Sequence, residues 1–532
     1  MTAPAQEACR DNVDYRRVKI RGTLCCESDL HLGDGATAGW RERTDLPPGR
    51  EPPELNVVDE KGNRKPLEYH TACLAAGRPY LPGSSLRGSL HGQLPEGDLR
   101  ERLFGLVRKP EEGASRAGRV RIHDAFLTQD PTFADRVEPP YWSAARHTAA
   151  RHAIAIDPLT GTAEHKKLFS HEIVPAGSAF AVEIEVDDIT RDELACLLGL
   201  LQRWEGGLWS ALGGKRGKGW GRVRWELAES GAVRVLNPDG LQRWLSTDDA
   251  PLDDFFKDGA ELVPILSAAI EQPVSLSFRL LADGPILVNE PGYRRTGGEG
   301  EEHPPTHEYS RRPGGRSIIP GKSLIGVVRG RARRILATIA HQHCGADPTR
   351  ALFVAKELTR ELFGHTGRRG ALWIGDAEAD QSPEDQPIPH PQFFNAIDRF
   401  TGGVKGPKGA GALFSVNACA DGSYSGQLLL ETGRLANKGD RADWWKGLLL
   451  LVARDAIEGD LAVGWGKAKG YGAFRAVLGE DTGLQIGTWP QLVEWARSRD
   501  DPAAWIASLH GEVEARLPAA PAPESDDAEG RP

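Results

Sequence analysis

Two short stretches, YLPGSSLRG at 80–88 and IIPGKSLIG at 318–326, have nearly the same sequence and lie about 240 residues apart. In each stretch a Pro-Gly pair ends an extended segment and is followed by Ser-Ser or Lys-Ser and then by apolar residues. This pattern is typical of the start of a helix. In the first copy, Leu86, Leu90 and Leu94 recur at the spacing of one helix face. Each stretch therefore predicts a turn followed by a helix capped by serine.

Four further motif pairs follow these stretches in the same order at offsets of about 240–260 residues. The pairs are RLFG (102–105) and ELFG (361–364), GRVRIHDAFL (118–127) and GALWIGDAEA (370–379), AIDPLTG (155–161) and AIDRFTG (396–402), and LGGKRGKGWGRVRW (212–225) and VGWGKAKGYGAFRA (463–476). A preserved order of this kind indicates two copies of one fold in a single chain.

Hydrophobic periodicity gives each copy the order strand, helix, two strands, helix, strand. In the first copy the outer strands are VKIRGTLCCES (18–28) and WGRVRWEL (220–227), and the second helix is RDELACLLGLLQRW (191–204). This order predicts an α+β fold of two tandem ferredoxin-like domains with long loop insertions, with the helices on one face of each sheet. We expect a first domain at 1–230, a connector at 231–272, a second domain at 273–478, accessory helices at 479–517 and a disordered tail at 518–532.

Composition excludes several classes of protein. The chain of 532 residues has no apolar run long enough to cross a membrane, and its N-terminus lacks the layout of a signal peptide. Its seven scattered cysteines form neither a disulfide framework nor a zinc motif, and HQHC at 341–344 has no second pair of ligands. We therefore expect a cytoplasmic protein without a membrane partner or a structural metal.

The net charge of −9 argues against a nucleic-acid partner, but the positive charges are concentrated. Residues 310–346 contain eight Arg or Lys and no carboxylate, and residues 212–225 contain five and again none. Because charges act over about 8–10 Å at physiological salt, such patches can bind phosphates on an acidic chain.

The two Gly-rich loops, 213–221 and 464–472, combine lysines with glycines that allow close approach of the backbone to a ligand, and Trp220 or Tyr471 can stack on a base. Two plainer interpretations stay open: the serines only cap helices, and the glycines only permit unusual dihedral angles. No phosphate-binding loop of the Walker type occurs. The RNA-binding candidates are Ser84, Ser85, Arg87, Lys215, Arg216, Lys218, Lys322, Ser323, Arg329, Lys467 and Lys469.

LHLGDG (30–35), the PGSSLRG motif, the AIDPLTG and AIDRFTG segments and the terminal Gly-rich loops resemble the RAMP superfamily of CRISPR-associated proteins. The resemblance covers about 18–227 and 273–476 and is greatest to backbone subunits of type III effector complexes. Two copies in one chain resemble the double backbone subunits of the III-D branch.

The resemblance implies a modified RNA-recognition-motif fold that holds a guide RNA, with target RNA, other RAMP subunits and the large subunit of the complex as partners. It also implies a hairpin thumb in each copy, at 130–175 and 379–425. Sequence is then read by base pairing, and the protein contacts phosphates.

The resemblance also implies that cleavage of target RNA depends on an aspartate before the PGSSLRG helix and on a divalent metal, Mg²⁺ or Mn²⁺. Asp59 follows two valines as in the family pattern, and Glu68 and His70 lie nearer to the helix. The corresponding loop of the second copy, 289–316, has no aspartate. The resemblance therefore implies at most one catalytic copy, the first.

Two alternative functions remain open. A guide-processing endoribonuclease needs histidines for proton transfer, for which His147, His152, His165 and His171 are available. A free-standing enzyme for phosphorylated small molecules needs a nucleotide motif or clustered metal ligands.

Overall fold

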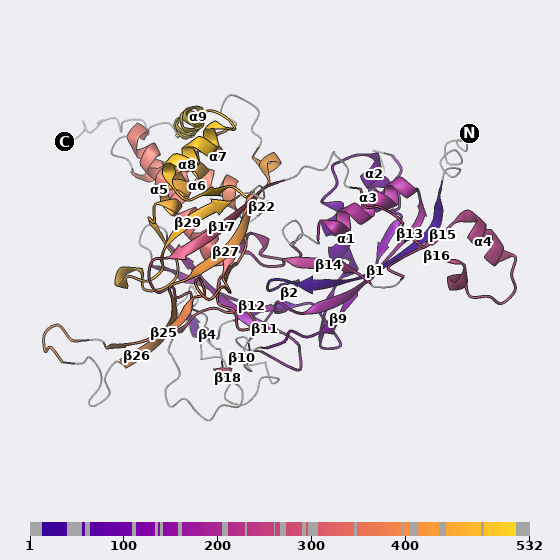
Figure 1. Ribbon diagram of the computed structural model, residues 1–532, viewed down its shortest axis with the longest axis horizontal. Coiled ribbons are helices and arrows are strands. Elements are labelled where there is room, and N and C mark those ends of the chain that lie inside the picture. The colour runs from indigo at the N-terminus through magenta and orange to yellow at the C-terminus, as the bar shows by residue number, and fades with distance from the viewer. Residues whose placement is uncertain are drawn as a thin grey trace, which may run out of the picture.

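The computed structural model describes residues 13–39, 56–58, 64–66, 68–108, 113–133, 137–138, 142–157, 162–204, 211–228, 231–259, 261–265, 273–289, 294–295, 307–344, 348–365, 367–395, 397–403, 413–435, 443–479 and 483–517. They form two lobes, each with its own sheet and helices, which we call the first half and the second half (Figure 1). None of the helices within these ranges has the length and hydropathy needed to cross a membrane.

The first half runs from β1 to β16. Its elements are β1 (Tyr15–Cys26), β2 (Gly33–Gly39), β3 (Asn56–Val58), β4 (Arg64–Pro66), β5 (Glu68–Ala72), β6 (Leu74–Ala75), β7 (Arg78–Leu81), α1 (Gly83–His91), α2 (Asp98–Phe104), β8 (Val120–Ile122), β9 (Ala125–Gln129), β10 (Val137–Glu138), β11 (Ala149–Ile156), β12 (Ala163–Ile173), β13 (Ala179–Ile189), α3 (Arg191–Gln202), η4 (Arg216–Lys218), β14 (Val223–Leu227), β15 (Val233–Leu236), α4 (Pro238–Leu245), η5 (Leu252–Phe255) and β16 (Lys257–Asp258).

The second half runs from β17 to α9. Its elements are β17 (Val274–Ala282), β18 (Arg294–Arg295), β19 (His307–Glu308), β20 (Ile318–Ile319), α5 (Gly321–Cys344), α6 (Pro348–Phe363), β21 (Gly364–His365), β22 (Arg368–Arg369), β23 (Leu372–Ile374), β24 (Ala377–Ala379), β25 (Ile388–Asn395), β26 (Leu413–Ala420), β27 (Ser423–Leu430), η6 (Thr432–Arg434), α7 (Trp444–Ile457), β28 (Leu461–Ala462), η7 (Lys467–Lys469), β29 (Ala473–Gly479), β30 (Gln485–Ile486), α8 (Trp489–Arg497) and α9 (Pro502–Ala515).

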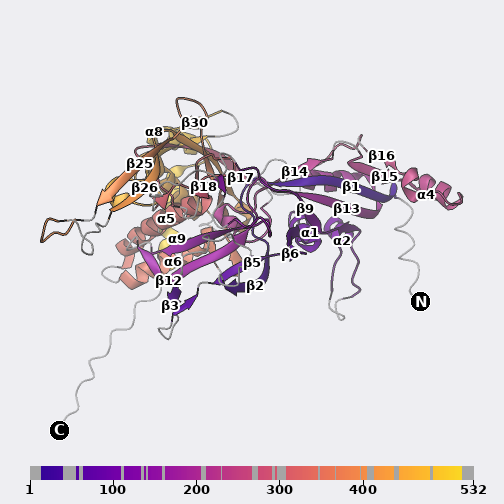
Figure 2. The same cartoon turned by 90° about the horizontal axis from the view of Figure 1, so that it is seen from below.

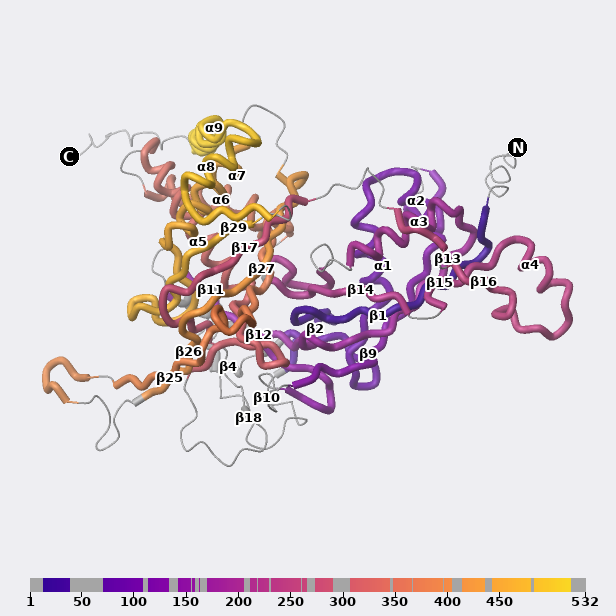
Figure 3. Tube along the Cα trace, in the orientation of Figure 1, coloured from indigo at the N-terminus to yellow at the C-terminus, as the bar shows by residue number. Residues whose placement is uncertain are grey.

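The two halves share one strand order. In the first sheet the order β14-β1-β13-β9-β7 is antiparallel throughout, and β29-β17-β27-β24-β20 repeats it in the second sheet. The colour change along the tube in Figure 3 shows that each sheet is built from one half of the chain. The internal repeat read from the sequence is therefore a repeat of structure.

Apolar helix faces build the core of each half. The helix α3 begins at Arg191 after a capping box formed by Thr190 and Glu193, and its leucines are buried. Leu86 and Leu90 on α1 are also buried against the first sheet, and α1 lies beside that sheet in Figure 2. Burial of one leucine side chain contributes roughly 1.5–3 kcal/mol, so these stripes fix the helices on the sheet.

The segment that we expected to connect the domains adds to the first sheet. The strand β15 pairs with β1, β16 pairs with β15, and α4 follows at the end of the lobe. In the tail of the chain, α8 and α9 pack on α7, where Trp505 and Leu509 are buried.

One hairpin in each half extends from the sheet, within the ranges expected for the thumbs. The strands β11 and β12 pair with each other, and so do β25 and β26. The first hairpin reaches the second half: the Lys322 ammonium of α5 lies 3.5 Å from the His152 carbonyl oxygen of β11, and β12 lies beside the second lobe in Figures 1 and 2. The second hairpin exposes Phe393 on β25 and Phe400 in the turn after it, which are 71% and 98% accessible.

Candidate nucleic-acid interface

A carboxylate from a neighbouring turn caps each PGSS or PGKS helix. The backbone N–H of Gly83 donates to Asp124 and that of Gly321 donates to Asp376, both at 2.7 Å. The serine caps predicted from the sequence are wrong, because α1 has Pro82 at its cap position and no side-chain cap from its own turn. The first amide of each helix is therefore already bonded, and a phosphate would have to use the later amides or the side chains.

The two Gly-rich loops have the same backbone conformation. Positive φ values recur at Gly213, Lys215, Gly219 and Gly221 and at their counterparts, Gly464, Gly466, Gly470 and Gly472. A Cβ on Gly221 would lie 1.9 Å from the Leu212 oxygen, and one on Gly472 would lie 2.0 Å from the Val463 oxygen. The glycines are thus required by local geometry, as the plainer interpretation held, and the loops present their lysines on a fixed backbone.

From the sequence we expected the rings of Trp220 and Tyr471 to be available to a ligand, and this expectation is wrong. They are 5% and 4% exposed and pack into the base of the loops. The ring of Trp220 contacts that of His171 at 5.6 Å, and the ring of Tyr471 contacts that of Trp465 at 5.4 Å. The aromatic residues are buried because each follows a glycine that turns the chain back toward the sheet.

The first Gly-rich loop lies between the halves. It packs on β23 and on the start of α5, where a Cβ on Gly219 would lie 3.0 Å from an Asp376 carboxylate oxygen and 3.3 Å from the Gly321 Cα. We call this contact the joint. It buries Asp376 to 8% exposure, whereas its counterpart Asp124 is exposed.

Charged residues surround the joint. Arg312 pairs with Asp376 at 2.9 Å and with Glu378 at 3.1 Å, and in the first half Arg151 pairs with Asp29 at 2.6 Å. Burial opposes ionisation of Asp29, but Arg151 and then Arg312 hold the pKa of its carboxyl below the ordinary value. Asp29 and Arg312 belong to different halves, so this attraction acts across the joint.

The second Gly-rich loop lies against the base of the β25–β26 hairpin. The Lys469 ammonium is 4.6, 5.1 and 4.7 Å from the ring centres of Phe394, Phe414 and Trp465. His307 lies beside this cluster, with its ring 5.5 Å from that of Trp465. A cation above three rings is held by their quadrupoles, so Lys469 has a fixed place while its side chain stays accessible.

Three histidines meet at the corresponding place in the first half. The ring of His171 lies 4.9 Å from that of His31 and 4.8 Å from that of His70. These residues come from the loop after β1 and from β5 and β12, and β5 pairs with β12 in parallel. Of the three, the sequence had singled out His70 and His171, but nothing local in the sequence signals that they meet His31.

The sequence-predicted catalytic residues are only partly brought together. Asp59 lies outside the described residues, Glu68 lies on β5 with its side chain outside them, and His70 is exposed beside His171. His70 on β5 pairs with His171 on β12, and His307 on β19 pairs with Val416 on β26. Because both pairings are parallel and involve the second strand of a hairpin, His307 is the counterpart of His70.

The predicted RNA-binding residues are not all presented to a ligand. Arg87 is turned inward and donates to the Phe104 carbonyl, and Arg216 lies in the joint, where burial lowers the pKa of its guanidinium. The Lys322 ammonium is 3.5 Å from the His152 carbonyl oxygen of the first hairpin. The Lys218 side chain is outside the described residues. Ser85 and Ser323 are half-buried. The exposed members of the set are Ser84, Lys215, Arg329, Lys467 and Lys469.

Together, the repeated sheets, the matching Gly-rich loops and the paired hairpins define a tandem α+β repeat protein whose loops carry basic residues. The family model of the RAMP superfamily matches residues 23–224 and 294–475, which is one match in each half. The chain therefore belongs to the RAMP superfamily, a family of CRISPR-associated RNA-binding proteins. No curated protein matches it.

Proposed function

We propose that this protein is a guide-RNA-binding backbone subunit of a type III CRISPR effector complex, similar to the double subunits of the III-D branch. Each half then serves as one ferredoxin-like, modified RNA-recognition-motif module, and the two hairpins serve as thumbs against the guide–target duplex. The observation that carries the proposal is that the RAMP match covers both halves, and both keep the same strand order and Gly-rich loop.

The charge distribution supports a phosphate-directed role. The exposed lysines Lys467 and Lys469 lie on a rigid loop. On α5, Lys322 lies in the first turn and Arg329 about two turns further along. Contacts to phosphates position a nucleic acid without reading its sequence. Where a guide RNA recognises its target by base pairing, the protein needs to supply only these phosphate contacts.

Cleavage of target RNA in the first half is a further part of the proposal, with Asp59, Glu68 and His70 as candidates. No group of three His, Cys, Asp or Glu within the described ranges is placed to hold a metal ion. Asp34 is an exposed carboxylate that accepts a hydrogen bond from the Thr71 hydroxyl, and a single carboxylate does not make a metal site. Asp59 and the side chain of Glu68 lie outside the described residues, so the metal stays a prediction and we route no step through it.

Guide binding is tested by purification without nuclease from cells that express a guide RNA. We expect excess absorbance at 260 nm and an RNA of defined length. Protein free of RNA under these conditions would contradict the proposal and favour the enzyme of phosphorylated small molecules.

Cleavage is tested on the assembled complex with complementary labelled RNA and Mg²⁺. We compare the wild type with Asp59→Ala and Glu68→Ala. Loss of cleavage in either variant would support that residue, and unchanged cleavage in both would remove the two carboxylates from the proposal.

A further inference from the structure

The helix α5 carries two arginines on a part that its counterpart α1 lacks or fills differently. The helix α1 has 9 residues and ends at His91, whereas α5 has 24 residues and ends at Cys344. Counted from the first residue of each helix, Arg329 corresponds to His91, and Arg333 lies beyond the end of α1. Arg329 and Arg333 are four residues apart and share one face of α5, which we call the α5 basic face. The repeated fold does not require these charges.

The α5 basic face has an excess of positive charge. Within the described ranges no carboxylate forms an ion pair with Arg329 or Arg333, and the buried Nε of Arg333 has no hydrogen-bond partner there. Burial lowers the pKa of the Arg329 guanidinium, and the charges of Arg333 and of Arg360 on α6 lower it further. Like charges one turn apart on a helix cost about 0.2–0.5 kcal/mol. A bound anion would remove this cost.

The surface of α5 is open between these cations. A Cβ on Gly326 or on Gly330 would meet no atom of the described residues within 4 Å, apart from the backbone of the helix itself. Arg329 is exposed and Arg333 is half-buried. An anionic chain can therefore lie along the backbone of α5 and reach both guanidinium groups.

The end of α9 lies near this face. Arg516, the residue after α9, pairs with Glu361 at 2.7 Å, and Glu361 follows Arg360 on α6. Leu517 packs against the core of the second half. The helices α5, α6 and α9 lie side by side in Figures 1 and 2. The chain after Leu517 therefore starts from a fixed point close to the arginines.

The sequence that follows Leu517 has the complementary charge. Residues 518–532 contain one arginine and four carboxylates, which are Glu524, Asp526, Asp527 and Glu529. Glu524 is 7 residues beyond Leu517, and that length of chain spans up to about 25 Å. Because the segment is tethered, its effective concentration near the face is about millimolar. An RNA from solution has no such advantage.

We propose that the carboxylates at 524–529 bind Arg329 and Arg333 and compete with RNA for the α5 basic face. The choice of RNA as the competitor rests on the proposed function, whereas the contact within the chain does not. A tethered anion excludes an RNA that is held at few phosphates, and it yields to a guide that is held at many. The segment thus acts against loosely bound RNA.

The contact is tested on the full-length protein without RNA by cleavage with a glutamate-specific protease. Mass spectrometry measures the release of peptide that begins at Ser525. If the segment occupies the face for about nine-tenths of the time, Arg329→Gln combined with Arg333→Gln should speed this cleavage about tenfold, because only the free segment is cut. High salt should also speed the cleavage of the wild type, because it screens the attraction.

The matched control removes two exposed arginines elsewhere, with Arg243→Gln on α4 and Arg497→Gln on α8. The control should be cut at the rate of the wild type. Equal rates for the wild type and for the variant without Arg329 and Arg333 overturn the inference, whatever the protein does with RNA.

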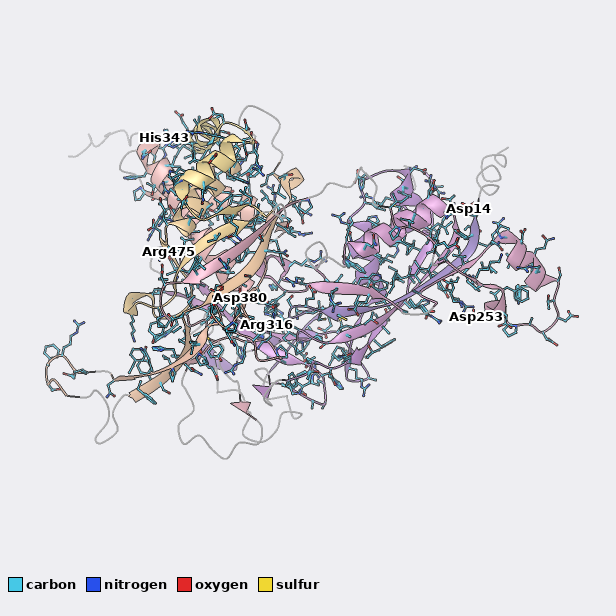
Figure 4. The ribbon with its side chains drawn as sticks, in the orientation of Figure 1. Asp14, Asp253, Arg316, His343, Asp380 and Arg475 are labelled. Carbon is cyan, nitrogen blue, oxygen red and sulfur yellow. The ribbon has the colours of Figure 1, made fainter. Side chains whose placement is uncertain are left out.

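Competition is tested by the binding of a short labelled oligouridine. Replacing the four carboxylates by amides should tighten binding about tenfold, and this gain should vanish when Arg329→Gln and Arg333→Gln are added. The control makes the same change of charge at the far end of the first half, which Asp253 marks in Figure 4. Its substitutions are Asp239→Asn, Asp248→Asn, Asp249→Asn and Asp254→Asn, all at exposed residues.

The outcomes separate this inference from the proposed function. A gain that persists without the two arginines, or that the control reproduces, overturns the competition at α5. A protein that neither binds oligouridine nor carries guide RNA contradicts the proposed function, and the protease result then decides the contact within the chain by itself.

Discussion

Asp376 and Arg312 form an ion pair at 2.9 Å inside the joint between the two halves, and the side chains are 7% and 11% exposed. Burial opposes the charge on Arg312, but Asp376 and Glu378 together raise the pKa of its guanidinium. Glu378 also pairs with Arg316, which lies at the centre of Figure 4 where the lobes meet. These ion pairs therefore lie within the second half, on the side that the first Gly-rich loop covers.

Removing one partner of this pair should destabilise the protein strongly. Asp376→Ala removes the closest counter-charge of Arg312, which still pairs with Glu378, and frees the Gly321 N–H, at an expected cost of about 1–3 kcal/mol in the free energy of unfolding. Asp124→Ala, the matched change at the exposed counterpart, removes only the bond to Gly83 and should cost about 0.5–1.5 kcal/mol. Urea unfolding measures both, and equal costs would contradict the role given to the joint.

Two glycines of one loop should differ in their tolerance of alanine. Both Gly470 and Gly472 have positive φ, at 85° and 81°, so both variants bear the strain of that conformation, about 1–2 kcal/mol. A Cβ on Gly472 also meets the Val463 oxygen at 2.0 Å, whereas one on Gly470 meets nothing within 4 Å. We expect Gly472→Ala to lower the melting temperature clearly more than Gly470→Ala, and the reverse order would show that the loop is not rigid.

Acid should destabilise the protein through His152 on β11, whose carbonyl oxygen lies 3.5 Å from the Lys322 ammonium of α5. Burial, with Lys322 and Arg151, lowers its pKa to about 4 from 6.5. The unfolded chain therefore binds this proton first, and stability is lost as the pH falls from about 6.5 to about 4, by about 3 kcal/mol in total. The His152→Gln variant lacks this imidazole, so its unfolding free energy should fall less between pH 7 and pH 4.5 than that of the wild type. A variant that loses as much as the wild type would contradict the shift.

Salt dependence should separate the lysines that meet phosphate from those that do not. Lys467→Ala should weaken binding of the single-stranded guide RNA and make the slope of log affinity against log salt concentration shallower by about 0.7. Lys446→Ala on α7, where the ammonium pairs with Asp443 at 2.8 Å, should leave the slope unchanged. Filter binding at several salt concentrations measures this, and equal slopes for Lys467→Ala and the wild type would remove Lys467 from the RNA-binding residues.

Local patterns in the sequence were enough to predict the repeat, the order of strands and helices, and the buried leucines of α3, because each depends on residues close together in the chain. The cap of α1 was missed because Asp124 comes from a turn 41 residues away. The histidine cluster was missed for the same reason. His70 meets His171 through the pairing of β5 with β12, and His31 meets it beside the bridge between Leu30 and Val174. Spacing alone does not reveal these contacts.

The first Gly-rich loop reaches the second half within one polypeptide, and this has a kinetic consequence. Two separate modules would meet at a rate set by their abundance in the cell. A tether converts that encounter into an internal step at an effective concentration of about millimolar. The two modules are therefore present in equal number and in one fixed order in every particle, however scarce the protein becomes.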